Sequence, residues 1–120
     1  MASKVVLVVD DDPDILSLVA LVLRGEGYVV ETAADGAEAL AAVARRLPNL
    51  ILLDMKMAGM DGWQFAREFH ARYDSGAPIV VLTAADDARK RAQEIGAQGW
   101  LGKPFTLDDL IAAVDRQHST

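Results

Sequence analysis

The stretch KVVLVVDDDPD, residues 4–14, decides the fold. Its apolar residues follow one another without alternation, as in a strand buried on both faces of a parallel sheet. Three aspartates follow the strand, and Asp12-Pro13 then predicts a helix. Aspartate caps free N–H groups, and proline fits the first helical position. We therefore expect a β–α unit with carboxylates at its turn.

The same unit recurs along the chain. Apolar runs predict further strands at residues 28–32, 50–53 and 79–82, and a short fifth strand contains Trp100 and Leu101. Helical patterns separate these strands, and the helix over residues 86–95 should end at Gly96. This alternation predicts an α/β fold with a doubly wound, five-stranded parallel sheet, helices on both faces and right-handed crossovers.

The expected helices have sequence signals for their starts and for their apolar faces. Capping boxes are predicted for Asp35 with Glu38 and for Thr106 with Asp109. Helical spacing predicts that the first helix buries Ile15, Leu18, Val19 and Val22. The same spacing predicts that the second helix, ended by Pro48, buries Leu40, Val43, Ala44 and Leu47.

Composition excludes several classes of protein. The 120 residues suit one domain, with a core from about residue 4 to 117 and no room for an output domain. The chain has no cysteine and only two histidines, which excludes disulfides and the usual zinc ligand sets. A net charge of −6 argues against direct binding to nucleic acid. No apolar run is long enough to span a membrane, and no secretory signal is visible, so we expect a cytoplasmic protein.

Polar residues stand at the ends of four of the five strands. Asp10 and Asp11 end the first strand, Asp54 the third and Thr83 the fourth, while Lys103 lies just after the fifth. Parallel strands present their carboxyl ends at one edge of the sheet, where such folds bind ligands. We therefore expect these five side chains to converge.

Three carboxylates in one place repel one another unless a cation joins them. Mg²⁺ prefers hard oxygen ligands and retains water, so Asp10 and Asp11 are expected to hold it. A metal, an ammonium group and a hydroxyl around a carboxylate suit phosphoryl transfer. Asp54 is then the candidate nucleophile, which would form an aspartyl phosphate. Thr83 and Lys103 are expected to contact the phosphoryl oxygens.

These residues lie in stretches that resemble the receiver domain of two-component response regulators, of the chemotaxis-regulator kind. The matching stretches are VVLVVDDDPDI, LLDMKMAGMDG, IVVLTA and GAQGWLGKPF, in this order and spacing. The resemblance implies a flavodoxin-like sheet with strand order 2-1-3-4-5. It also implies that Asp54 is the phosphoacceptor, that Asp11 is a direct ligand of Mg²⁺ (or Mn²⁺), and that Asp10 acts through metal-bound water.

The resemblance assigns roles to further residues. Lys56 would ligate the metal through its backbone carbonyl, together with Asp54. Thr83 and Ala84 would contact the phosphoryl group, and Trp100 takes the position of the switch aromatic residue. The bond between Lys103 and Pro104 is expected to be cis. Trp100 is larger than the tyrosine or phenylalanine common there, and Ala58 replaces a frequent proline.

The resemblance also implies partners and a mode of action. A histidine kinase or phosphotransfer protein would supply the phosphoryl group, and the fourth helix, fifth strand and last helix would change shape for a downstream protein target that the sequence does not identify. The protein would be a monomer when unphosphorylated, with dimerisation on activation left open. It would not be an enzyme beyond catalysing its own phosphorylation and slow dephosphorylation.

Two alternative functions remain open at this point. Asp10 and Asp12 form the Asp-x-Asp pattern of haloacid-dehalogenase phosphatases, which are Mg²⁺-dependent. However, those enzymes usually carry threonine or valine where this chain has Asp14, and they need a cap domain. The other alternative is a receiver-fold interaction module that is never phosphorylated. Turnover of a generic phosphatase substrate and Mg²⁺-dependent labelling separate these possibilities.

Overall fold

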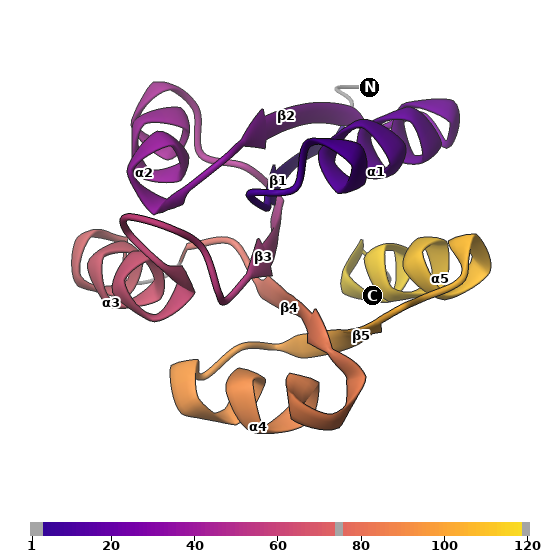
Figure 1. The fold of residues 1–120 in the computed structure, drawn as a ribbon. Helices are drawn as coiled ribbons and strands as arrows, with labels where there is room; N and C mark the ends of the chain where they lie inside the picture. The colour runs from indigo at the N-terminus through magenta and orange to yellow at the C-terminus, as the bar shows by residue number, and fades with distance from the viewer. Residues whose placement is uncertain (1–3, 74–75, 119–120) are drawn as a thin grey trace.

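Runs of apolar residues form a parallel sheet at the centre of the molecule. The computed structural model describes residues 4–73 and 76–118. In these residues the sheet has the order β2-β1-β3-β4-β5, as expected (Figure 1). Its strands are β1 (Val5–Val9), β2 (Val29–Ala33), β3 (Leu50–Asp54), β4 (Ile79–Ala84) and β5 (Gly99–Lys103). β1 and β3 are buried along their whole length because helices cover both faces of the sheet.

Helices cover the sheet in two layers. The helices are α1 (Pro13–Gly25), α2 (Gly36–Arg45), α3 (Gly62–Arg72), α4 (Ala85–Ile95) and α5 (Leu107–His118). Figure 1 shows α1 and α5 on one face of the sheet, with α2, α3 and α4 on the other. Each layer has its own apolar core, one containing Leu23 and Leu110 and the other Phe65 and Phe69. None of the described helices is long and apolar enough to cross a bilayer.

Most helix starts follow the sequence signals. The Asp12 side chain accepts a hydrogen bond from the backbone N–H of Asp14 at 2.9 Å, with proline at the start of α1. Thr106 and Asp109 form the predicted capping box. Asp35 caps α2, but the Glu38 carboxylate accepts from the N–H of Ala34 instead of Asp35, so the predicted box is only half formed. The strand predicted at residues 28–32 is found one residue later, at Val29–Ala33.

Two predicted helix faces need correction. Leu47 is 48% exposed because α2 ends at Arg45 and the chain becomes extended at Arg46, and Ala44 lies within α2 but on its exposed side. Pro48 disfavours a helical conformation at the residue before it, which explains the early end. In α1, Leu18 is 42% exposed and the most deeply buried side chains are Val19, Ala20 and Leu23. The apolar face of α1 is therefore rotated away from the predicted one.

Candidate functional site

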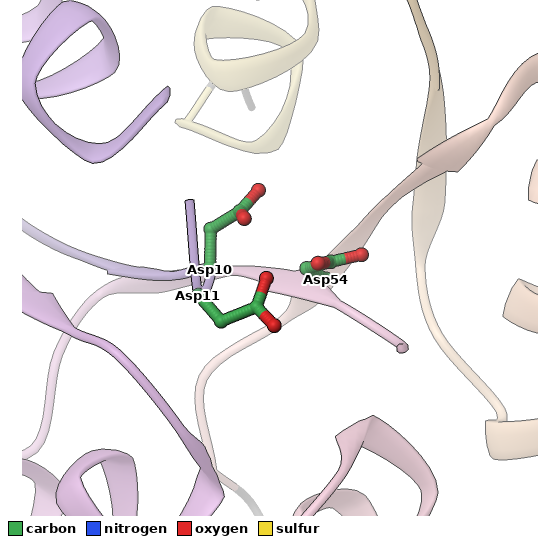
Figure 2. Close-up of side chains that lie close together, drawn as sticks. All are labelled: Asp10, Asp11 and Asp54. Carbon is green, nitrogen blue, oxygen red and sulfur yellow. The ribbon is translucent and has the colours of Figure 1, made fainter. Parts of the chain in front are cut away.

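Three carboxylates converge at the carboxyl edge of the sheet. Val9 of β1 pairs with Leu53 of β3, so Asp10 and Asp11 leave β1 beside Asp54 at the end of β3. One oxygen from each of the three side chains lies within 4.8 Å of the others. Figure 2 shows these side chains projecting from the ends of the two neighbouring strands. The predicted convergence of the aspartates is therefore present.

Asp10 is the most enclosed of the three acids. Its side chain is buried, and both oxygens are already used within the protein. Oδ1 accepts a hydrogen bond from the backbone N–H of Asp12 at 2.9 Å, and Oδ2 lies 2.6 Å from the ammonium group of Lys103. Lys103 is the last residue of β5, whereas the sequence pattern predicts it just after that strand. Asp10 thus anchors the only described cation that contacts the cluster by a salt bridge.

The surroundings of Asp54 disfavour the ionised form of its carboxyl group. Burial raises the pKa of its carboxyl to about 6, and the negative charges of Asp10 and Asp11 act in the same direction. The Lys103 ammonium, 3.8 Å from Asp54 Oδ2, and a hydrogen bond from the backbone of Lys56 oppose this rise in the pKa. Among the described residues, Lys103 pairs with Asp10 and Asp54 but not with Asp11, so the ionised site has a surplus of negative charge and favours a bound cation.

This arrangement fits a small divalent metal ion. The exposed Asp11 and the buried Asp54 both offer oxygens to a common position, whereas each oxygen of Asp10 already has one partner within the protein, Lys103 or the N–H of Asp12. Carboxylate oxygens with access to water suit Mg²⁺, which prefers oxygen ligands and keeps part of its hydration shell. A cation would also relieve the repulsion that raises the pKa of Asp54.

The other predicted site residues lie around this cluster at different depths. Thr83 is buried in β4, on the strand next to Asp54, while Ala84 is exposed and pairs with Lys103. The Lys103–Pro104 peptide bond is cis. Lys56 is exposed, and its backbone N–H points to Asp54. Their roles in metal binding and phosphoryl contact stay predictions.

Trp100 lies apart from the acids. It is on β5 in register with Val81, and its side chain is 47% exposed. It lines a hollow together with Gln98, Gly99, Arg116 and Gln117. An inward position for this ring would therefore require a rearrangement relative to the present structure.

Two glycines that the sequence reasoning did not single out shape the site. A Cβ on Gly62 would lie 2.8 Å from the carbonyl oxygen of Asp54, so the β3–α3 loop folds back tightly on the site. A Cβ on Gly102 would lie 2.5 Å from the Cα of Ala85, which brings the start of α4 against β5. The signals were present as Asp61-Gly62 and Gly102-Lys103, but close backbone approach depends on tertiary packing.

Known proteins share both the sequence and the fold. The family model described as "Response regulator receiver domain" matches residues 6–115. The DNA-binding response regulator MtrA of Mycolicibacterium smegmatis is 43% identical over 111 residues, covering 91% of this chain and 48% of that protein. The transcriptional regulatory protein PrrA of Mycobacterium tuberculosis is 41% identical over 116 residues, covering 95% of this chain and 49% of that protein. The chain thus spans about half the length of these curated relatives.

Solved structures agree with this likeness. The chemotaxis protein CheY4 of Vibrio cholerae superposes with a TM-score of 0.86 at 36% identity, covering 96% of this chain and 98% of that chain. The receiver domain of NtrX from Brucella abortus gives a TM-score of 0.85 at 36% identity, covering 93% and 96% of the two chains. The strand order and the five helices are therefore those of a CheY-like, flavodoxin-like fold.

Proposed function

The chain belongs to the response regulator receiver domain family of two-component signalling systems, and from this premise we propose that Asp54 is its phosphoacceptor. The observation that carries the proposal is the position of Asp54. It ends a central strand beside two further acids, and a lysine reaches it from β5. A carboxylate so placed can attack phosphorus while neighbouring positive charge neutralises the phosphoryl oxygens.

Each residue of the site has a defined task in this mechanism. An Asp54 oxygen forms the new P–O bond as the P–N bond of a phosphohistidine donor breaks. The Lys103 ammonium, held by Asp10 at 2.6 Å, is positioned to bind a phosphoryl oxygen. Asp11, Asp54 and the backbone carbonyl of Lys56 would hold Mg²⁺ (or Mn²⁺), which supplies charge neutralisation. Asp10 positions Lys103 and would reach the metal through water.

Phosphorylation would then act as a conformational switch. A phosphoryl group adds charge and strong hydrogen-bond acceptors beside Thr83 and Ala84. Thr83 would move to donate a hydrogen bond, and Trp100 would follow, which changes the face made by α4, β5 and α5. Phosphorylation thus shifts the population between two states of that face. The phosphoryl donor would be a histidine kinase or phosphotransfer protein in the cytoplasm. The downstream target would be a protein that binds this altered face.

The phosphatase alternative is less well supported. In that reading Asp12 would serve beside Asp10, but Asp12 is exposed and its side chain caps α1 through the N–H of Asp14. Its carboxylate is not a member of the acid cluster found among the described residues. We therefore propose that the protein is no enzyme beyond its own phosphorylation and slow dephosphorylation. The complete acid set likewise argues against a module that is never phosphorylated.

The test is labelling by acetyl phosphate with and without Mg²⁺. Wild-type protein should gain one phosphoryl group per chain, and both EDTA and Asp54→Asn should abolish the labelling. Asp14→Asn is the matched control because Asp14 is an exposed acid in the first turn of α1, outside the cluster. Labelling of Asp54→Asn at the wild-type rate would refute the assignment. Release of product from p-nitrophenyl phosphate with multiple turnovers would favour the phosphatase.

A further inference from the structure

Helix α4 packs on the sheet mainly through small side chains. Its buried side chains are only Ala88 and Ala92, whereas α3 buries two phenylalanines. Ala84 precedes α4 and provides no side-chain cap for its first turn. The other described helices each have a capping side chain at their start, from Asp12, Asp35, Asp61 and Thr106. Alanine buries little apolar area, so contacts other than those of the two alanines can contribute to the position of α4.

Side chains from α3 and α4 supply such contacts. The indole N–H of Trp63 donates to Glu94 Oε1 at 3.0 Å. The Arg91 guanidinium lies 5.3 Å from the centre of the Trp63 ring, and Arg91 Nη1 lies 3.1 Å from both oxygens of Glu94. We call these three residues the α3–α4 clamp. Cation–π stacking, a hydrogen bond to a charged acceptor and an ion pair thus join at one point.

The clamp bridges two helices that are not closely packed around it. A cavity of about 290 Å³ lies beside it, lined by Ala66, Arg67, His70, Ile95 and two members of the clamp. The clamp residues are partly shielded, since the Arg91 side chain is 19% exposed and that of Glu94 is 35% exposed. Arg91 and Glu94 are three residues apart on α4, and the contact of Trp63 with Glu94 links this pair to α3.

The two helices that the clamp joins both follow strands that end at the candidate site. The loop after Asp54 leads to Trp63 at the start of α3, and Thr83 leads into α4 after a single further residue. Gly102 packs against Ala85 with no space for a side chain, which fixes the first residue of α4 against β5. A displacement of Thr83 is therefore passed to α4, and the clamp opposes movement of the helix relative to α3.

From this geometry we propose that the α3–α4 clamp is a conformational restraint that holds α4 in its unphosphorylated position. The inference rests on the proposed function and adds a regulatory element to it. Because the clamp stabilises one of two states, opening it lowers the free energy needed to reach the other. Weakening the clamp should therefore make the protein easier to activate, besides lowering its stability.

The experiment measures binding of beryllofluoride, which mimics an aspartyl phosphate, by calorimetry in the presence of Mg²⁺. Trp63→Phe keeps an aromatic ring but removes the N–H donor, and Arg91→Met removes the cation but keeps an unbranched side chain. Each variant should bind beryllofluoride about 5- to 10-fold more tightly than wild type, at the lower end of the usual range of coupling between sites. Amide hydrogen exchange of residues 85–95 should be faster in both variants without beryllofluoride.

Glu68→Gln is the matched control. It breaks the ion pair between Glu68 and Arg72, which lies within α3 and joins no second helix. The control should leave the beryllofluoride affinity unchanged. If the clamp variants lose stability but bind beryllofluoride with wild-type or weaker affinity, the clamp is only structural and the inference is wrong. If wild-type protein binds no beryllofluoride at all, the proposed function itself fails.

Discussion

Replacing Asp54 with asparagine should make the metal-free protein more stable at neutral pH. Burial and the neighbouring acids raise the pKa of Asp54 from 3.8 to about 6. This rise of about 2 units corresponds to about 3 kcal/mol, the free energy by which the folded state disfavours the ionised carboxylate. Asparagine has nearly the same shape without the charge, and Lys103 keeps its 2.6 Å contact with Asp10.

The sign of the pH dependence follows from the direction of the shift. Between about pH 4 and 6 the folded state keeps a proton on Asp54 that the unfolded chain releases. The stability contributed by this group is therefore fully present below about pH 3.8 and is lost as the pH rises through about 6. Asp54→Asn should exceed wild type in free energy of unfolding by about 2–3 kcal/mol at pH 7.5 and by little at pH 4.

Urea denaturation in EDTA at both pH values measures this difference. Glu68→Gln serves as the control for loss of an exposed acid, and a change within about 0.5 kcal/mol is expected because its ion pair is on the surface. Mg²⁺ should then raise the stability of wild type at pH 7.5 more than that of Asp54→Asn, since it neutralises the repulsion that the mutation removes. Wild type that is as stable as Asp54→Asn at pH 7.5 in EDTA would refute the electrostatic reasoning.

Three further perturbations test other parts of the structure. Lys103→Met leaves the buried Asp10 carboxylate without its ion-pair partner, so the free energy of unfolding in EDTA should fall by about 3–5 kcal/mol. An unchanged urea midpoint would contradict the burial of that pair. Phe69→Ala, at a fully buried ring that stacks on Phe65, should cost about 3–5 kcal/mol by the same measurement, and a loss below 1 kcal/mol would argue against this core. Burial lowers the pKa of His118, so an NMR titration should find this pKa below that of a model imidazole. Wild type should therefore lose stability as the pH falls below 6.5, and His118→Asn should remove that loss. An ordinary pKa for His118 would contradict its packing against Tyr28.

The sheet and the acid cluster could be predicted because they depend on local signals. Uninterrupted apolar runs identify strands buried on both faces, and parallel strands bring their carboxyl ends to one edge whatever their exact bounds. Asp10, Asp11 and Asp54 therefore meet even though the second strand begins one residue later than predicted. The strand order came from the family resemblance and was confirmed.

Other features depend on packing that a single sequence does not specify. The end of α2 follows from the effect of Pro48 on Leu47, which competes with the helical spacing of apolar residues. The contact of Trp63 with Glu94 joins residues on separate helices, and its partners cannot be chosen among the many charged residues from spacing alone. The ion pair between Asp10 and Lys103 likewise depends on tertiary packing, although both residues were expected in the site.

The most direct test of the central claim is to identify the residue that carries the phosphoryl group. Protein treated with acetyl phosphate and Mg²⁺ would be reduced with borohydride, which converts an aspartyl phosphate to homoserine, and then digested and sequenced by mass spectrometry. If Asp54 is the phosphoacceptor, homoserine should be found at position 54 and at no other aspartate, and only when Mg²⁺ is present. Homoserine at Asp10 or Asp11, or none at position 54 in protein that has taken up phosphate, would contradict it.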